Sequence, residues 1–452
     1  MFKSVLIANR GEIACRIIRT LREMGVQSVC VYAESDAQSL HVKQADLAVS
    51  LGEGNVSQTY LDADKIIEIA KKYQCEAVIP GYGFLSENAE FARECEAQGI
   101  AFVGPTPEQM QQFGLKHSSR ELCEKAGVPV TPGTGLLQNL DDALRAADTL
   151  GFPLMLKSTA GGGGIGLQRC DDEDTLIDVF ETTRRLGENY FKDAGVFLER
   201  FVASARHIEV QIIGDGEGKV IALGERDCSL QRRNQKVIEE CPAPNLPEAT
   251  RQKMHDAAIA LGKSVNYRNV GTVEFIYDVA LDEFYFLEVN SRLQVEHPVT
   301  EAVFGIDLVH WMLAVAAKEA PEALVTETAP AASGWAIEAR VYAEEPLHDF
   351  QPSPGELTWV DFSKAKAAGA RVDTWVESGV EVSAFYDPLV AKVIVEGDDR
   401  DTAIKALHDA LSCSELAGIS TNLDYLRQLS DWNLWHCAKN SNHSIGVNNL
   451  NW

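Results

Sequence analysis

Strand-like and helix-like hydrophobic patterns alternate along the first hundred residues. Residues 5–8 form a short apolar run typical of a buried strand, and residues 12–24 repeat apolar positions at helical spacing. Further elements alternate in the same way, with strands predicted at 29–32, 77–79 and 101–103 and helices at 63–73 and 88–98. Strands joined by crossover helices form a parallel sheet. We therefore predict an N-terminal doubly wound α/β domain over 1–113, with its last strand ending before the Gly-Pro-Thr-Pro sequence at 104–107.

Strands dominate the middle of the chain. The predicted elements are helices at 116–126, 248–265 and 307–317 and strands at 154–157, 196–201 and 335–342. A stretch rich in Ala, Pro, Glu and Thr at 321–333 is typical of a domain boundary. We predict a second domain over 114–330, a third, with a mixed sheet, over 334–435, and a disordered, asparagine-rich tail over 436–452.

Composition and charge exclude several classes of function. Of the 452 residues, 45% are hydrophobic and 24% charged, which is typical of a globular protein. The 67 acidic residues outnumber the 41 basic ones, and the net charge of −26 would repel nucleic-acid phosphates. The ten cysteines include no Cys-x-x-Cys pair, so we expect buried free thiols rather than a zinc site or a disulfide framework.

Apolar segments are short throughout the sequence. The first one runs only from Val5 to Ala8 before Arg10 and Glu12 interrupt it, which makes it too short for a secretory signal. No segment approaches the roughly 18 apolar residues of a membrane span. We therefore expect a cytoplasmic protein that binds neither membranes nor nucleic acids.

A glycine run follows the strand predicted at 154–157. Gly161, Gly162, Gly163 and Gly164 come shortly after Lys157. Glycines let backbone N–H groups approach phosphate oxygens, and the lysine could add a positive charge there. However, the run lacks the Gly-Lys-Ser/Thr ending of a P-loop, and glycine runs also form flexible linkers. Both a phosphate site and a linker fit this pattern.

One face of the segment 284–298 carries an unusual row of polar side chains. The segment alternates with period two, and its polar face consists of Glu288, Asn290, Arg292, Gln294 and Glu296. A half-exposed strand would also alternate, but Asn and Glu are poor strand formers and β-branched residues are usual on exposed strand faces. We therefore favour a catalytic wall.

The preceding strand, 272–277, carries Glu274. If the two strands form a hairpin centred near Leu281, Glu274 falls opposite Glu288. Two facing carboxylates repel each other unless a cation lies between them. With Asn290 they offer the hard oxygen ligands that Mg²⁺ takes beside nucleotide phosphates. Surface carboxylates without a metal are the alternative.

Arg292 and Glu296 would lie beyond this metal on the same face. A guanidinium can bind a planar oxyanion through two parallel hydrogen bonds, and a nearby carboxylate can remove a proton. Bicarbonate is a planar oxyanion with one proton to lose. The pattern therefore fits a site that binds and deprotonates bicarbonate.

Long motifs match one known family. From Ser4 to about Arg427, the chain resembles the biotin carboxylase components of biotin-dependent carboxylases, which have the ATP-grasp fold. The matching runs are IANRGEIA at 7–14, PGYGFLSEN at 80–88, RHIEVQ at 206–211, ERDCS at 225–229 and the segment 288–301. Other ATP-grasp enzymes share only a looser pattern of lysines, glycine loop and acidic pair.

The resemblance implies a nucleotide site and a metal site. The residues expected to contact ATP are Lys116, Lys157, the glycines Gly162, Gly163 and Gly164, His207 and Gln231, with Glu199 to Val202 lining the adenine pocket. Magnesium would be bound by Glu274, Glu288 and Asn290. Residues from about 131 to 203, with the glycine hairpin, would form a lid that excludes water.

The resemblance also implies the chemistry. Lys236 and Arg292 would hold bicarbonate and the transferring phosphate, and Glu296 would deprotonate bicarbonate for attack on the γ-phosphate of ATP. Carboxyphosphate would release carbon dioxide, and its phosphate would take the proton from the biotin ureido nitrogen. Arg340 would stabilise the negative oxygen on biotin. Tyr82 and Asp387 lie near that end of the site in the family.

Departures from the common family pattern indicate a branch. Ile165 stands where arginine is common, and Asn234 stands where histidine is common. With the sequences KSTA at 157–160 and DTWVE at 373–377, these residues resemble urea carboxylases, including guanidine-using relatives. The alternatives are an acetyl-CoA, propionyl-CoA or pyruvate carboxylase, an ATP-grasp ligase without biotin, or an inactive nucleotide-binding regulator.

Biotin would have to come from outside this sequence. No Met-Lys-Met biotinylation site occurs in it, so we expect a biotin carrier protein or domain as partner, together with a carboxyltransferase. The resemblance also makes a homodimer the expected assembly. The final carboxyl acceptor is not specified by these residues.

Overall fold

The computed structural model describes residues 1–159, 166–191, 195–232 and 234–431. The glycines predicted to bind phosphate, Gly162, Gly163 and Gly164, lie outside these residues, and so does the predicted tail. The described cysteines are free, and all except Cys413 are buried, as expected from their spacing.

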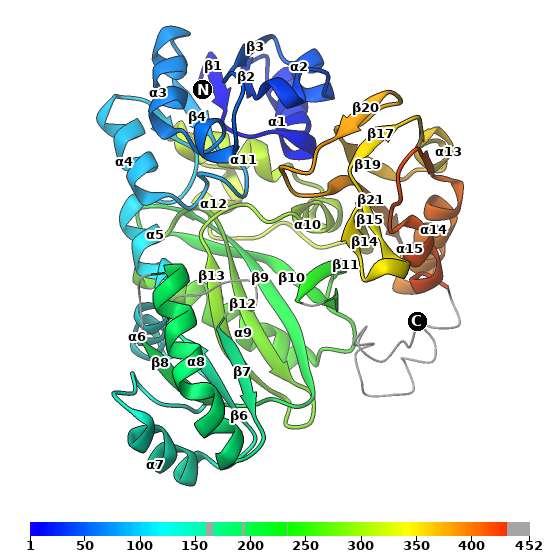
Figure 1. Ribbon diagram of the computed structural model, residues 1–452. Coiled ribbons are helices and arrows are strands. Elements are labelled where there is room, and N and C mark those ends of the chain that lie inside the picture. Colours follow the sequence, from blue (N-terminus) through cyan, green and yellow to red (C-terminus); the bar gives the residue numbers. More distant parts are fainter. Residues whose placement is uncertain (160–165, 192–194, 233, 432–452) are drawn as a thin grey trace.

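The N-terminal region is a doubly wound parallel sheet, as predicted (Figure 1). Its strands are β1 (Ser4–Ile7), β2 (Gln27–Tyr32), β3 (Leu47–Ser50), β4 (Ala77–Ile79) and β5 (Ala101–Phe102), in the order β3-β2-β1-β4-β5. Its helices are α1 (Gly11–Glu23), α2 (Leu40–Gln44), α3 (Ala63–Lys72), α4 (Ala89–Ala97) and α5 (Pro107–Gly114).

Alternate residues of β1 enter two different cores. Val5 and Ile7 pack with α1 residues, whereas Leu6 packs with residues of α3 and α4 on the other face. A central parallel strand is buried on both faces, which explains its unbroken apolar sequence. The Gly-Pro-Thr-Pro sequence does not continue as a loop: Thr106 caps helix α5, with Pro107 in its first turn.

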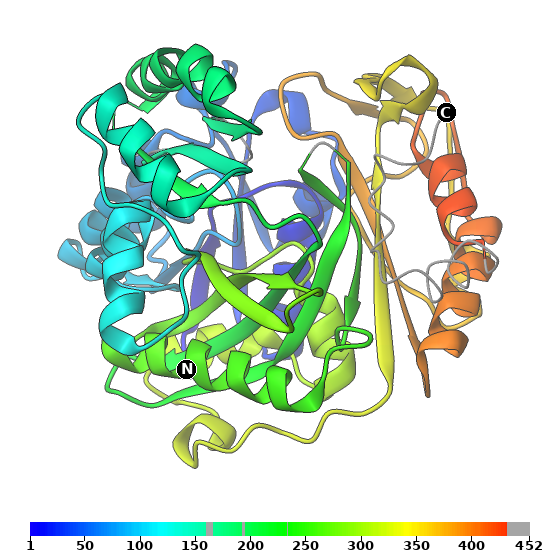
Figure 2. The same ribbon diagram turned by 90° about the horizontal axis from the view of Figure 1, so that it is seen from below.

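A small three-stranded sheet follows helix α6 (Lys116–Ala126). It consists of β6 (Leu154–Ser158), β7 (Leu167–Cys170) and β8 (Val196–Arg200) in the order β7-β6-β8, with helices α7 (Leu140–Leu150) and α8 (Glu173–Phe191). Leu154, Phe180 and Leu198 belong to a core that is separate from the rest of the molecule. In Figure 2 this unit lies on the opposite side of the molecule from the C-terminal helices.

An eight-stranded sheet forms the centre of the molecule, in the order β13-β12-β9-β10-β11-β14-β21-β19. Its first five members are β9 (Ala205–Asp215), β10 (Val220–Arg232), β11 (Gln235–Cys241), β12 (Arg268–Asp278) and β13 (Glu283–Asn290). The helices of this region are α9 (Glu248–Ser264), α10 (His297–Phe304), α11 (Leu308–Ala316) and α12 (Glu322–Val325).

The C-terminal region continues the same sheet, because β14 pairs antiparallel with β11. Its strands are β14 (Trp335–Tyr342), β15 (Glu344–Glu345), β16 (Gln351–Pro352), β17 (Gly355–Leu357), β18 (Trp359–Asp361), β19 (Arg371–Thr374), β20 (Val380–Val382), β21 (Leu389–Gly397) and β22 (Glu415–Ala417). Its helices are α13 (Ser363–Ala367), α14 (Arg400–Cys413) and α15 (Leu423–Leu429).

The predicted C-terminal end of strand β13 was wrong. The polar segment was expected to remain extended as far as Glu296, but β13 ends at Asn290 and α10 begins at His297. Pro298 at the start of α10 lacks an N–H that a strand would need and has a φ angle suited to the first turn of a helix.

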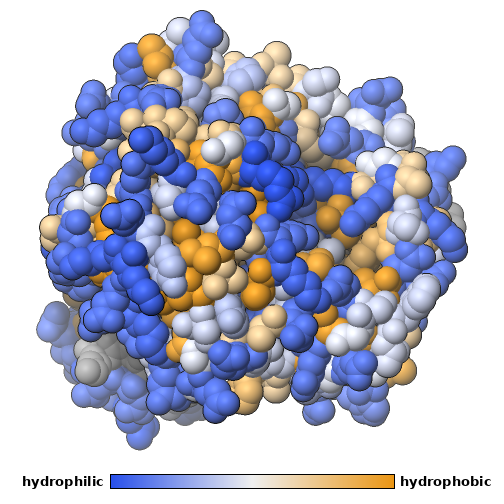
Figure 3. All heavy atoms as spheres, turned by 90° about the horizontal axis from the view of Figure 1, so that it is seen from above, coloured by the Kyte–Doolittle hydropathy of each residue, from blue (hydrophilic) through white to orange (hydrophobic). Residues whose placement is uncertain are grey.

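The face of the molecular surface in Figure 3 is mostly hydrophilic, as expected from the share of charged residues and the short apolar segments of the sequence. On this face, hydrophobic residues gather toward the centre (Figure 3). Within the described residues, no single helix is long and apolar enough to cross a membrane. The α10–α11 pair meets the length and composition criteria only jointly and is bent by 95°.

Candidate active site

A cavity of about 730 Å³ lies where the three regions meet. Its wall includes eleven residues that the sequence singled out for the site: Tyr82, Lys157, His207, Gln231, Lys236, Glu274, Glu288, Asn290, Arg292, Arg340 and Asp387. Clefts of this volume are typical of sites for small molecules and cofactors. The fold therefore brings together residues, such as Tyr82 and Asp387, that are more than three hundred positions apart in the sequence.

The pairing of Glu274 with Glu288 inferred from the sequence is confirmed, although the register shifts by one residue on the turn side, where Phe275 pairs with Phe286. Strands β12 and β13 pair antiparallel with Glu274 opposite Glu288 and Thr272 opposite Asn290. The Asn290 amide donates a hydrogen bond to Glu274 at 2.8 Å. Glu274, Glu288 and Asn290 thus share the cavity wall, and their carboxylate and amide oxygens are the donor set that Mg²⁺ requires. The residues present fit the ion.

Lys236 supplies a cation among these carboxylates. Its ammonium group, from β11, lies 2.6 Å from Glu209, 3.0 Å from Glu274 and 2.6 Å from Glu296. Burial alone would lower the pKa of Lys236, but Cys228 and the three carboxylates raise it well above its ordinary value. Lys236 is therefore a fixed positive charge at the centre of the site.

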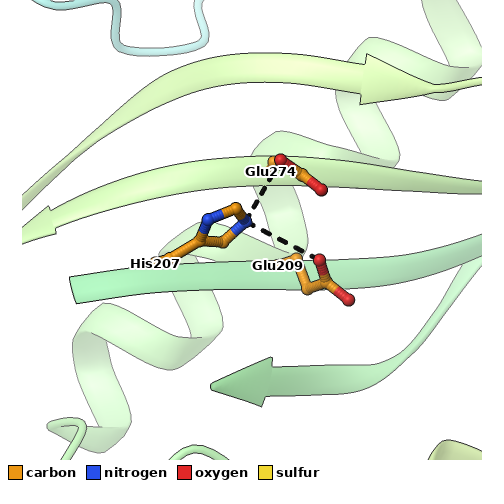
Figure 4. Close-up of side chains that lie close together, drawn as sticks. All are labelled: His207, Glu209 and Glu274. Carbon is orange, nitrogen blue, oxygen red and sulfur yellow. Dashed lines mark ion pairs between the residues drawn. The ribbon is translucent and has the colours of Figure 1, made fainter. Parts of the chain in front are cut away.

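His207 on β9 faces two of these carboxylates, Glu209 and Glu274 (Figure 4). Its Nε2 atom lies 3.1 Å from Glu274 and 3.7 Å from Glu209, and Gln231 contacts its Nδ1 atom at 3.1 Å. Burial lowers the pKa of His207, but Glu274 and Glu209 together raise it, and the net shift is upward. The reciprocal effect appears at Glu274: burial would raise its pKa, but Lys236 and His207 bring it far below its ordinary value.

Glu296 lies beneath the cavity wall and is fully buried. It forms ion pairs with Lys236 at 2.6 Å and with Arg340 at 2.8 Å. Burial alone would raise the pKa of Glu296, but Lys236, Arg340 and Arg226 together hold it well below its ordinary value. Glu296 is therefore an ionised carboxylate between two cations that reach the cavity.

Arg292 has different neighbours from those expected. The sequence placed it beside Glu296, but its guanidinium donates to Glu87 at 2.9 Å, to Gln294 at 3.0 Å and to Asn290 at 3.1 Å. The cause is the end of β13, because residues after Asn290 no longer alternate across a strand. Arg292 still lines the cavity, where its charge can attract an anion.

The expected adenine-site residues lie outside the cavity wall formed by the described residues. Glu199 and Val202 are buried, and Glu199 binds Lys157 at 2.5 Å and Arg120 at 2.8 Å. Lys157 itself lines the cavity. Lys116 is the first residue of α6, and its side chain lies outside the described structure.

Tyr82 and Asp387 lie at the part of the cavity formed by the N-terminal and C-terminal regions. The Tyr82 hydroxyl donates a hydrogen bond to Glu12, and its backbone carbonyl accepts one from Asn9 at 2.7 Å. Asp387 accepts a hydrogen bond from the Leu389 N–H at 2.9 Å. Both side chains are thus fixed beside the cavity.

The sequence reasoning missed Glu209. This buried residue binds Lys236, and Arg226 donates to it at 2.6 Å. The signal was present, because His207, Glu209 and Gln211 occupy alternate positions of β9 and so form a second polar row beside the first.

Comparisons with known proteins agree with this geometry. Three family models match successive parts of the chain: "Biotin carboxylase, N-terminal domain" at 1–110, "Carbamoyl-phosphate synthase L chain, ATP binding domain" at 116–323 and "Biotin carboxylase C-terminal domain" at 338–442. A urea amidolyase from Lachancea kluyveri is 57% identical over 97% of the chain, but the chain spans only 24% of that relative's length.

Other relatives are of the same size as this chain. The biotin carboxylase of Halalkalibacterium halodurans is 46% identical, and the match covers 95% of this chain and 94% of that protein. A crystal structure of a biotin carboxylase–β,γ-ATP complex from Campylobacter jejuni covers 97% of both chains at 39% identity, with a TM-score of 0.91. The matching family models, the shared length and the shared fold lead to one conclusion: this chain belongs to the biotin carboxylase family of ATP-dependent ligases.

Proposed function

We propose that this chain is the biotin carboxylase part of a urea or guanidine carboxylase. The observation that carries the proposal is the difference in identity, 57% to the urea amidolyase against 46% to the stand-alone biotin carboxylase, over almost the same residues. The branch residues Ile165 and Asn234 support the same choice. Its partners would be a biotin carrier and a carboxyltransferase, as protein or domain, and the chain would act as a homodimer.

The proposed division of labour follows the three regions. Residues 1–113 would form the N-terminal domain, 114–330 the ATP-grasp domain and 334–435 the C-terminal domain. The unit of β6, β7, β8, α7 and α8 has its own core, so it can move without breaking the central core, as a lid must. Closure over the cavity would exclude water, which would otherwise hydrolyse carboxyphosphate.

Biotin carboxylases use ATP, Mg²⁺ and biotin, and the cavity offers groups suited to each. Lys157, His207 and Gln231 would contact the nucleotide, together with Lys116 and the glycine loop. Mg²⁺ bound by Glu274, Glu288 and Asn290 would neutralise phosphate charge. Phosphoryl transfer depends mainly on such positioning and charge neutralisation.

Glu296 would be the base that deprotonates bicarbonate. In the structure, burial would raise its pKa, but Lys236, Arg340 and Arg226 outweigh burial and hold the pKa well below its ordinary value. Bicarbonate and the γ-phosphate would attract the same two cations, and the basicity of Glu296 would rise as they turn toward these anions. The carboxylate would thus become a base only when substrate is bound.

The remaining steps of the proposed reaction balance in atoms and charge, and Arg340 on the cavity wall assists the last of them. An oxygen of deprotonated bicarbonate attacks the γ-phosphorus, and ADP leaves. Carboxyphosphate then splits into carbon dioxide and phosphate, and the phosphate removes the ureido proton of biotin. The biotin nitrogen attacks carbon dioxide, while Arg340 stabilises the negative charge on the ureido oxygen.

Two assays test the proposal. The chain should hydrolyse ATP slowly with bicarbonate and faster when free biotin is added; turnover that ignores biotin at every concentration would favour a ligase that does not use it. The chain should then be combined with biotin carrier and carboxyltransferase partners and supplied with urea, guanidine, acetyl-CoA, propionyl-CoA or pyruvate. Carboxylation of an acyl-CoA or of pyruvate, with neither urea nor guanidine consumed, would overturn the urea carboxylase assignment.

A further inference from the structure

A pair of buried acids lies next to the active site. Glu239 on β11 and Glu338 on β14 are register partners on adjacent antiparallel strands, and both are fully buried. Side chains of register partners leave the sheet on the same face, with Cβ atoms about 4.5–5.5 Å apart. The two carboxyl groups therefore face each other in the interior, where two like charges repel strongly.

The nearby cations are too few to neutralise every acid. Six charged groups face the pair: Glu12 of α1, Glu209 of β9, Lys236 of β11, Glu296 at the N-cap of α10, Arg340 of β14 and Lys392 of β21. Arg226 forms an ion pair with Glu209 and neutralises its charge. The four carboxyl groups that remain are those of Glu12, Glu296, Glu239 and Glu338, and the three cations are Lys236, Arg340 and Lys392. Lys236 also forms an ion pair with Glu274. An unpaired buried carboxylate is much less stable than a protonated one.

The contacts indicate which acid carries the proton. Glu239 forms an ion pair with Arg340, 2.5 Å from Oε1 to Nε. The carboxyl oxygens of both acids lack a hydrogen-bond partner among the described residues, so the ion pair with Arg340 is what distinguishes Glu239 from Glu338. A neutral Glu338 could donate its O–H to Glu239, which would leave Glu239 ionised for Arg340 and give Glu338 a partner.

We propose that Glu239 and Glu338 share one proton, carried by Glu338, and that this pair positions Arg340. The proposal rests on the function proposed above, in which Arg340 acts on biotin. Glu239 holds the Nε edge of the guanidinium and Glu296 holds its NH2 group, at 2.8 Å. With one proton on the pair, Arg340 faces two carboxylates. Without it, a third negative charge lies beside the anion site and repels bicarbonate.

The pKa values of both acids agree with a retained proton. Burial raises the pKa of Glu239 to about 7 against the opposing effect of Arg340, and burial raises the pKa of Glu338 well above its ordinary value. Because both values exceed that of an exposed glutamate, the folded protein keeps the proton after an unfolded chain has lost it. Stability and bicarbonate affinity should therefore fall as the pH rises through the folded-state pKa.

Infrared spectroscopy tests the proton itself, without any activity assay. The folded wild-type protein at neutral pH should show the carbonyl stretch of a buried neutral carboxylic acid that resists hydrogen exchange. Glu338→Gln should remove this band, and so should Glu239→Gln, because Glu338 then ionises beside Lys392. The matched control is Glu240→Gln, on the same strand, where the carboxylate is ion-paired with Arg400 at 2.7 Å. No such band in wild type, or a band that survives both substitutions, would overturn the proposal.

A pH profile tests the positioning role. The KM for bicarbonate of wild type should rise with pH, by up to about tenfold per unit once the proton is lost. Glu338→Gln is permanently neutral, so its KM should stay flat over the same range. A purely structural role for Glu338 would change thermal stability and leave the wild-type profile in place, which would refute positioning. If wild type has no bicarbonate-dependent turnover, the proposed function fails, and the infrared result still decides whether the proton is shared.

Discussion

Glu296 is the residue whose substitution tests the catalytic assignment most directly. Glu296→Gln keeps the size of the side chain but removes its charge from between Lys236 and Arg340, which lie at 2.6 and 2.8 Å. A hydrogen bond to a charged group contributes about 1.5–3 kcal/mol. Lys236 keeps Glu209 and Glu274, and Arg340 keeps Glu239, so neither cation loses all its partners. We expect a stability loss of only about 1–3 kcal/mol.

Although Glu296→Gln should lower the free energy of unfolding only slightly, it should lower kcat strongly. Removal of a general base typically lowers turnover by about 10²–10⁴-fold. ATP hydrolysis with bicarbonate and biotin gives kcat, and calorimetry gives the affinity for ATP, which should stay nearly constant because Glu296 lies beneath the cavity wall.

Glu301→Gln is the matched control for this experiment. Glu301 is also buried, lies on α10 and binds two arginines, Arg16 at 2.6 Å and Arg371 at 2.7 Å, but it does not line the cavity. Its substitution should cost similar stability and leave kcat within about twofold. If Glu296→Gln turned over at more than about a tenth of the wild-type rate, a general-base role would be refuted.

Three further substitutions have defined outcomes. Lys157→Ala should weaken ATP binding by about 10- to 100-fold in calorimetry, the value of one hydrogen bond to a charged group; an unchanged Kd would remove Lys157 from the nucleotide site. Arg10→Met should lower the free energy of unfolding by about 3–5 kcal/mol in urea titrations, because Arg10 binds Asp36 twice at 2.6 Å in the interior and stacks on Trp375; a loss below about 1 kcal/mol would contradict this. His41 is buried, and burial lowers its pKa to about 4, so stability should fall by roughly 3 kcal/mol between about pH 6.5 and pH 4 as the unfolded chain takes up a proton that the folded chain refuses. Thermal unfolding of His41→Gln should lack this part of the acid slope, and parallel curves for both proteins would disprove it.

Local patterns predicted much of the fold and part of the site. The alternation of both strands and a turn near Leu281 placed Glu274 opposite Glu288 correctly, but they did not predict the register shift between Glu274 and Phe275. The unbroken apolar run of β1 likewise predicted a strand covered on both faces.

Contacts between distant segments were beyond such reasoning. Lys236 reaches Glu296 from β11, sixty residues away, and no pattern within either segment specifies that distance. The extent of the polar strand was overestimated because side-chain alternation continues past Asn290, while backbone pairing does not. Glu209 was missed because the segment 206–211 was interpreted only as a family motif. Its alternating polar residues were not recognised as a second polar row beside that of β13.

The pairing of β11 with β14 has a consequence for dividing the chain. The family models separate the second and third regions between residues 323 and 338, yet hydrogen bonds of one sheet cross that boundary. A fragment cut there would leave β11 with unsatisfied backbone groups and expose Val237 and Ile238, which pack against the C-terminal core. Such a fragment should aggregate or recruit a foreign strand, so the catalytic half and its C-terminal neighbour have to be produced as one polypeptide.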